Sequence, residues 1–232
     1  MAMGIRELSR EVHAWLRQPA LAAVLAAIAT IPPDKALKPL FSSLCSCEPL
    51  VKWHAVSAMG QSVAALADGE MEAARVVMRR FMWMLNDESG GIGWGVPEAM
   101  GECLTRHAGL AGEYTHVLVS FMREDGFYLE LPALQQGLLW GVARLAAVAP
   151  DALRAQAAVR YLLPYLDADD HVVKGLACLA LGRLGDGLLI PSLSPHLVDT
   201  RQLTLYQEGT FLEITVGDIA RQAMKQLGGH AG

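Results

Sequence analysis

The sequence contains few aromatic and few charged residues. Phe, Trp and Tyr make up only 6% of the 232 residues, and Asp, Glu, Lys and Arg make up 19%, whereas 53% are hydrophobic. A chain with this share of hydrophobic residues can bury a sizeable core, which excludes global disorder. The formal net charge is −5, so a basic excess for gripping polyanions is missing and nucleic acid is an unlikely partner. The hydrophobic residues are mostly Ala and Leu, which favours closely packed helices.

Cysteine and metal-binding patterns are also scarce. The four cysteines are too few for a secreted disulfide framework in a chain of this length. Cys45 and Cys47 have no second ligand pair at zinc-site spacing, so we interpret them as reduced residues of a helix. The seven histidines are scattered, and Asp169-Asp170-His171 is typical of a turn and helix cap. We therefore expect no catalytic residues, no metal and no cofactor.

No apolar run is long enough to cross a membrane. Ala20–Ile31 is apolar but short, and it follows a charged amphipathic segment. A signal peptide would have this order, but Glu7 and Glu11 lie among arginines and Pro19 suits the start of a helix. We therefore predict a helix pair, no membrane contact and a cytoplasmic location.

A ten-residue block recurs along the chain and predicts the fold. Each copy has the form apolar-x-x-x-small-small-x-Ala-apolar-Gly, which is a helical pattern. The copies end on glycines spaced 41, 40 and 41 residues apart, and a fifth, degenerate copy follows at 216–227. The four copies are 51–60, 92–101, 132–141 and 173–182, ending on Gly60, Gly101, Gly141 and Gly182.

The fourth copy, VVKGLACLALGRLGD (172–186), resembles the second helix of a HEAT repeat of the PBS-lyase-like variety, V-R-x-x-A-A-x-A-L-G-x-x-G-D. The resemblance covers roughly residues 33–229. It implies an all-α HEAT-like α-α superhelix, or solenoid, of about five to six helix pairs. The expected organisation is one domain, 1–232, with a capping helix pair at 1–32, repeats at 33–200, and a β-hairpin plus terminal helix at 201–232. The resemblance indicates a scaffold without specifying a function.

The segments between the blocks predict the remaining elements. The expected first helices are Pro33–Cys45, Met71–Leu85, Gly109–Arg123, Asp151–Leu166 and Leu189–Leu197, after a capping pair at Ile5–Leu16 and Ala20–Ile31. Residues 203–206 and 210–216 alternate in polarity around Gln207-Glu208-Gly209, which predicts a β-hairpin. This hairpin either blunts the C-terminal end of the array or offers a docking edge.

Two tryptophans are the leading candidates for function. The third position of each block is not needed for packing, yet it holds Trp53 and Trp94 in the first two copies. Tryptophan is enriched at binding hot spots. The alternative is that each packs against a neighbouring helix, which is what we expect of Trp83. Trp140 takes the core position before its glycine.

Further candidates follow from the helical period. Residues one and two turns after the tryptophans, and residues beside them, extend the same stripe. The Gly-rich segment 86–95 could cradle an anion, but its acidic residues favour a cation or a basic partner segment. Pro97 is expected inside the helix that carries Trp94. The full predicted partner-binding set is Trp53, His54, Ser57, Glu88, Trp94, Glu98, Glu102 and Gln135.

Three functions remain open at this point. The leading hypothesis is a non-catalytic protein-protein binding module or assembly scaffold that uses the concave face of the solenoid to bind a protein, with a basic segment of the partner as one option. The second resembles HEAT-like DNA glycosylases that excise alkylated bases, although only Lys52, Lys174 and Arg183 supply cations on the second helices. The third is a carrier or lyase for a flat, tetrapyrrole-like ligand. The oligomeric state is left open.

Overall fold

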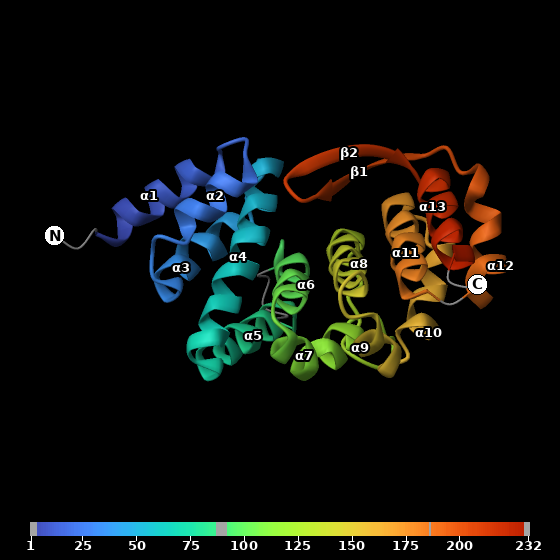
Figure 1. The fold of residues 1–232 in the computed structure, drawn as a ribbon, viewed down its shortest axis with the longest axis horizontal. Coiled ribbons are helices and arrows are strands. Elements are labelled where there is room, and N and C mark those ends of the chain that lie inside the picture. The colour runs from blue at the N-terminus through green and yellow to red at the C-terminus, as the bar shows by residue number, and fades with distance from the viewer. Residues whose placement is uncertain (1–3, 87–91, 186, 230–232) are drawn as a thin grey trace. The chain divides into compact units, whose positions relative to one another are not determined.

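The computed structural model describes residues 4–86, 92–185 and 187–229, and these are mostly helical with one small antiparallel β-hairpin (Figure 1). The chain divides into two compact units. The first comprises 1–110 together with 208–210, and the second comprises 111–207 and 211–232.

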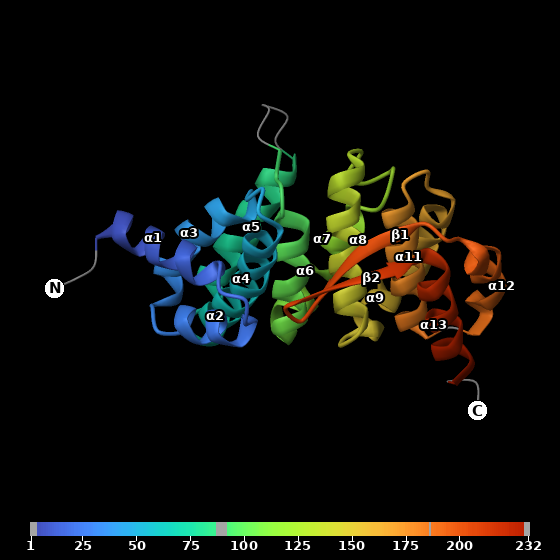
Figure 2. The same cartoon turned by 90° about the horizontal axis from the view of Figure 1, so that it is seen from above.

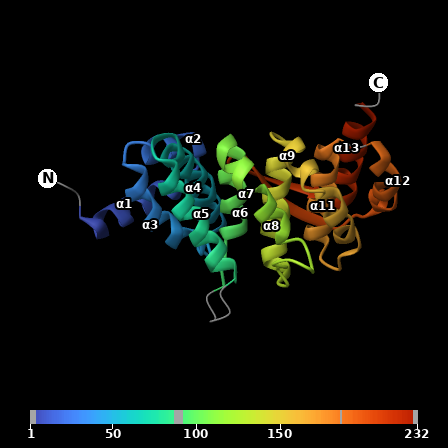
Figure 3. The same ribbon diagram turned by 90° about the horizontal axis from the view of Figure 1, so that it is seen from below.

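The first unit is built around one long helix, α4. Its helices are α1 (Ile5–Leu16), α2 (Leu21–Ile28), α3 (Pro33–Leu44), α4 (Pro49–Gly69), α5 (Met71–Asn86) and α6 (Val96–Arg106). Helix α4 packs chiefly against α3 and α6, and α5 lies beside it (Figure 3). The expected capping pair and the first two helix pairs are therefore present.

Prolines mark where many of these helices begin. Pro33, Pro49 and Pro132 each occupy the first turn of a helix, where the missing N–H would have no intrahelical partner. Pro97 does the same in α6, so it lies in the first turn of a helix that begins after Trp94 and not, as expected, in the interior of a helix that carries Trp94. Helix α6 starts late because Gly95 adopts a left-handed conformation with φ of 74°.

The second unit begins within α7 (Ala108–Ser120) and contains several short helices. They are α8 (Pro132–Ala146), α9 (Pro150–Ala155), α10 (Ala158–Leu162), the 3-10 turn η1 (Leu163–Asp167), α11 (His171–Leu184), η2 (Gly187–Leu189), α12 (Ile190–Leu193), η3 (Ser194–Val198) and α13 (Val216–Gly229). Two segments predicted as single helices, 151–166 and 189–197, are thus broken into pieces. In the first of them Ala157 has a φ of 53°, which a continuous α-helix cannot accommodate.

All five sequence blocks coincide with second helices, α4, α6, α8, α11 and α13. In the first unit α4 packs on α6, and in the second α11 packs on both α8 and α13 (Figure 2). The block glycines allow these close approaches. A Cβ on Gly60 would lie 2.6 Å from Glu102 Cγ, and one on Gly182 would lie 2.5 Å from Ala223 Cβ. The repeat prediction is confirmed by these helices.

The predicted hairpin is formed by β1 (Gln202–Gln207) and β2 (Thr210–Thr215). Its first strand packs over helices of its own unit. The Trp140 indole nitrogen on α8 donates to the Tyr206 carbonyl at 2.9 Å, and Leu203 would be 3.0 Å from a Cβ on Gly175 of α11. The strand therefore covers two second helices of its own unit, whereas from the sequence we had considered blunting of the C-terminal end or a docking edge. Trp140 itself is buried, as predicted.

Two smaller expectations can also be compared with the structure. Cys45 and Cys47 are free and exposed, but they lie in the connection after α3 and not within a helix. Among the residues described, we find no helix with the length and apolarity needed to cross a bilayer.

Candidate partner-binding surfaces

The predicted glutamates lie inside the first unit, between α4 and α6. Both Glu98 and Glu102 are buried on α6, and each is paired with a cation of the same unit. Lys52 Nζ is 2.6 Å from Glu98 Oε1, and Arg106 Nε is 2.6 Å from Glu102 Oε1. A buried carboxylate needs such a partner because desolvation of an unpaired charge is costly. The Lys52–Glu98 pair therefore joins α4 to α6, the Glu102–Arg106 pair lies within α6, and neither carboxylate faces solvent.

The predicted α4 residues His54 and Ser57 are buried as well. His54 Nδ1 lies 3.0 Å from the Leu16 carbonyl of α1. Burial lowers the pKa of His54, only partly offset by this hydrogen bond, so the neutral imidazole is favoured. Its Nε2 has no hydrogen-bond partner among the described residues. His54 thus ties α4 to the capping helices.

The two candidate tryptophans occupy different environments. Trp53 is half-buried on α4, and Lys52 Nζ lies 5.3 Å from its ring centroid, a cation–π arrangement. Trp94 is 41% exposed and precedes α6. The prediction that Trp94 and Glu98 share one helix face was therefore wrong, because Gly95 delays the start of the helix.

Three exposed apolar residues lie on two chain segments that approach each other near Trp94. They are Trp83, exposed by 66%, Ile92, exposed by 42%, and Trp94 itself; we call these three residues the aromatic surface. The two chain segments that carry them are in contact, since a Cβ on Gly93 would lie 3.0 Å from the Met84 carbonyl oxygen.

The end of α3 fixes the backbone of this segment. A Cβ on Gly95 would lie 2.6 Å from the Leu44 carbonyl oxygen, so only glycine fits this approach. Cys45 Sγ lies 4.0 Å from the Trp94 carbonyl. Trp94 is therefore presented to solvent by a backbone that is held on two sides.

Sequence reasoning missed Trp83, which we had expected to fill a gap between helices. Its neighbours along α5 carried the signal. Val76 lies seven residues earlier on the same helical face, and Arg79 and Arg80 lie between them. A tryptophan on a face with two arginines is more consistent with exposure than with burial. The remaining loop prediction, Glu88, lies outside the described residues.

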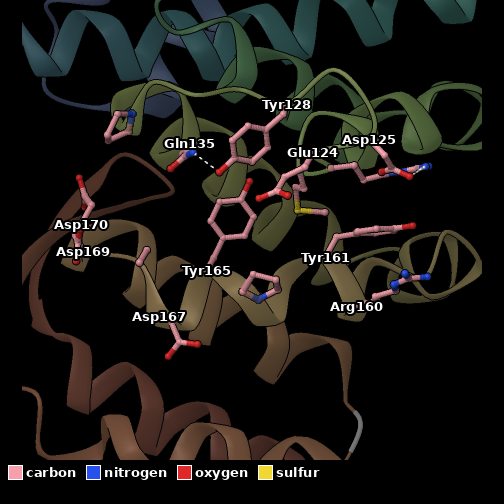
Figure 4. A pocket seen from close by; sticks show the side chains of 15 residues that line it. Glu124, Asp125, Tyr128, Gln135, Arg160, Tyr161, Tyr165, Asp167, Asp169 and Asp170 are labelled. Carbon is pink, nitrogen blue, oxygen red and sulfur yellow. Dashed lines mark hydrogen bonds and ion pairs between the residues drawn. The ribbon is translucent and has the colours of Figure 1, made fainter.

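The last predicted residue, Gln135, lies in the second unit and lines a cavity of about 700 Å³ (Figure 4). The cavity lies between the 122–135 segment and the 160–170 segment. We call it the tyrosine pocket because Tyr128, Tyr161 and Tyr165 contribute to its wall. Only the Tyr161–Tyr165 spacing, one helical turn, was visible in the sequence. The fold brings Tyr128 to them.

Hydrogen bonds organise one wall of the tyrosine pocket. Gln135 Nε2 donates to the Tyr128 hydroxyl at 3.0 Å and to the Leu129 carbonyl at 2.8 Å. The Tyr165 hydroxyl is buried and has no hydrogen-bond partner among the described residues. Burial, followed by the influence of Tyr128, raises the pKa of Tyr165 above its ordinary value, so the hydroxyl stays protonated.

The charges around the pocket are mostly negative. Arg123 and Asp125 form a two-bond ion pair at 3.0 and 2.9 Å, which lowers the pKa of Asp125 through the side-chain hydrogen bonds. Asp170 caps α11 and accepts from Val172 N at 2.8 Å. Across the described residues we find no group of three or more His, Cys, Asp or Glu side chains that could hold a metal ion.

Comparison with known proteins identifies the fold alone. No family model and no curated protein matches this sequence. Among solved structures, a designed armadillo repeat protein in complex with the peptide (KR)4 has a TM-score of 0.55 and 15% identity, covering 94% of this chain and 98% of that one. An engineered protein has a TM-score of 0.54 and 16% identity, covering 96% and 97%.

A second designed armadillo repeat protein has a TM-score of 0.50 and 15% identity, covering 94% of this chain and 98% of that chain. These identities support a shared fold without a shared function. Together with the second helices that pack on one another within each unit, they show that the chain has the fold of an armadillo/HEAT-like helical repeat solenoid.

Proposed function

We propose that this protein is a non-catalytic binding module that recognises a partner protein through the aromatic surface of its first unit. The observation that carries the proposal is the exposure of Trp83 and Trp94, by 66% and 41%. Large exposed apolar side chains on adjacent segments are typical of interaction sites, and tryptophan is enriched among the residues that dominate binding energy.

The fold supports the same role. Repeat scaffolds stack units whose surfaces offer extended binding faces. A designed armadillo repeat protein of similar fold was solved in complex with a peptide, (KR)4. That protein is 15% identical to this chain, so it supports binding of a polypeptide and leaves the chemistry of the partner to the residues of this chain.

Those residues favour an apolar partner segment over a basic one. Glu98 and Glu102 of the predicted partner-binding set are buried and paired with Lys52 and Arg106, so they offer no free charge to a basic segment. The acidic loop residues on which a basic partner was predicted lie outside the described residues. An exposed aromatic side chain gains most by burial against apolar atoms. The predicted residues Trp53, His54, Ser57, Glu98 and Glu102 then contribute by fixing the helices beneath the aromatic surface.

The test is capture of partners from the native host, identified by mass spectrometry, followed by affinity measurement with the purified partner. The paired substitution Trp83→Ala and Trp94→Ala should weaken binding by about 30-fold or more, as expected for loss of hot-spot residues. Both side chains are exposed, so the free energy of unfolding should change by no more than about 0.5 kcal/mol per site.

Val198→Ala is a suitable control, because Val198 is an exposed apolar residue of the second unit. It should leave the affinity unchanged. Salt dependence identifies the partner's chemistry. An apolar contact keeps its affinity between 0.1 and 0.5 M salt, whereas a basic segment loses affinity as its charges are screened. Unchanged capture by the folded double variant contradicts the proposal.

The nucleic-acid alternative receives less support from the positions of its cations. Lys52 is paired with Glu98, and Arg183 Nη1 donates to the Ala143 carbonyl at 2.8 Å. Of the three cations that the sequence offered as candidates, this leaves Lys174 to contact phosphate. A salt-dependent shift of duplex DNA in a gel would favour that alternative.

A further inference from the structure

We propose that the tyrosine pocket of the second unit binds a primary alkylammonium group, carried either by a lysine side chain or by a free polyamine. This site is separate from the aromatic surface, which belongs to the first unit, and it does not depend on the function proposed above.

The first argument concerns the Tyr165 hydroxyl. Tyr165 is 5% exposed, and its hydroxyl has no hydrogen-bond partner among the described residues. A buried polar group without a partner destabilises the folded state, which is why such groups are rare. In Figure 4 the ring of Tyr165 points into the cavity with its hydroxyl toward that of Tyr128. A bound polar group could satisfy the Tyr165 hydroxyl.

The second argument concerns which kind of polar group fits. Nε2 of Gln135 already donates to Tyr128 and to the Leu129 carbonyl, so its two amide hydrogens are used and its Oε1 is the atom left to accept. Figure 4 shows the Glu124 carboxylate directed toward the two tyrosine hydroxyls. Acceptors therefore predominate in this wall. An ammonium group carries three donors and no acceptor, and complements such a wall.

The third argument is charge. Glu124, Asp167 and Asp169 line the pocket, and their carboxylates form no ion pair in the part of the chain that the structure describes. Two cations, Arg123 and Arg160, also line the pocket, but acidic side chains outnumber them. Arg123 is paired with Asp125, and the guanidinium carbon of Arg160 is 5.6 Å from the Tyr161 ring centroid. The resulting negative potential attracts a cation.

The fourth argument is size and surface. The cavity of about 700 Å³ lies within the range of about 300–1,000 Å³ that is usual for ligand sites. It can therefore hold an alkyl chain in addition to the charged group. Aromatic rings bind both parts, since methylene groups pack on them and cations are attracted to their faces.

The experiment is calorimetric titration of the whole chain at pH 7 with two amines, Nα-acetyl-lysine methylamide and spermidine. We expect saturable binding of at least one of them at one site per chain, and the tighter amine identifies the source. The neutral isostere Nα-acetyl-norleucine methylamide should bind at least about tenfold more weakly, because it lacks the charged donors. Absence of saturable binding of both amines, or equal binding of the neutral isostere, overturns the proposal.

Two variants test the assigned atoms. Tyr165→Phe should weaken amine binding by about three- to tenfold and yet raise the thermal midpoint, because it removes a buried unpartnered hydroxyl. Glu124→Gln should weaken binding by about threefold or more and reduce its salt dependence. The matched control is Tyr114→Phe on α7, which does not line the pocket and should leave affinity unchanged. A Tyr165→Phe protein that binds amine as tightly as the wild type overturns the assignment.

Discussion

The packing of α11 against α13 depends on the absence of one methyl group. Gly182 lies where the two helices approach most closely, and a Cβ there would be 2.5 Å from Ala223 Cβ and 2.6 Å from Ala223 Cα. Contacts this short do not occur in real structures, and the Cα belongs to the backbone, which cannot rotate away. Gly182→Ala must therefore move α13 relative to α11.

The size of the effect follows from two opposing contributions. Overpacking a close-packed site costs about 1–3 kcal/mol, and the collision with the Ala223 backbone places this site in the upper part of that range, at about 2–3 kcal/mol. Replacing glycine with alanine inside a helix returns about 1 kcal/mol through helix propensity. The net expectation for Gly182→Ala is a loss of about 1–2 kcal/mol in the free energy of unfolding, or roughly 2–8 °C in the thermal midpoint of a chain of this size.

Gly112 provides the matched control, because a Cβ at this position in α7 has no atom within 4 Å. Gly112→Ala gains the helix propensity without the collision and should stabilise the protein by about 0.5–1 kcal/mol. Urea unfolding of the two variants beside the wild type measures both changes. The reasoning is refuted if Gly182→Ala is as stable as the wild type or if the two substitutions shift stability in the same direction.

Three further predictions concern buried polar groups. Lys52→Met leaves the Glu98 carboxylate buried without its cation and should lower the free energy of unfolding by about 2 kcal/mol. Adding Glu98→Gln should recover most of that loss. Urea unfolding of the single and double variants measures both changes. The pKa of His54 in the folded protein lies below its ordinary 6.5, so as the pH falls the unfolded chain binds a proton at this histidine before the folded chain does. The free energy of unfolding should therefore decline below pH 6.5. His54→Gln should flatten that decline in a pH series of denaturation curves. Trp140→Phe removes the bond to the Tyr206 carbonyl and should lower stability by about 1–2 kcal/mol in thermal unfolding; an unchanged midpoint contradicts this.

Much of the fold was predictable because every copy of the sequence block meets the same physical requirement, which is close packing of one helix on the next. Each second helix must approach its neighbour closely, so small residues recur and the first four copies end on glycine. Each block lies in a second helix, although the second block becomes helical only at Val96. The broken helices could not be predicted in the same way. The left-handed Ala157 is imposed by tertiary packing, and nothing about alanine itself signals it. The domain organisation and the role of the concave face stay predictions.

The candidate site was predicted less completely, because helical period does not distinguish a buried position from an exposed one. Ser57 and Glu98 have the predicted spacing, but a neighbouring helix covers both. Trp94 was found because the repeat did not require it, although it lies outside the helix. The tyrosine pocket depends on Tyr128, which lies in a connecting segment more than 30 residues before Tyr161, and no local pattern links them.

The contacts of the β-hairpin predict which residues can be substituted in homologous sequences. Leu203 rests where a side chain on Gly175 would otherwise project, and Trp140 is bonded to the same strand. The residues at positions 140 and 175 are therefore expected to vary together with the hairpin. In homologous sequences that have lost the hairpin, position 175 should be free to carry a large side chain, and position 140 should lose its preference for an indole. Where the hairpin is kept, both positions should resist substitution even though they lie far from it in the chain.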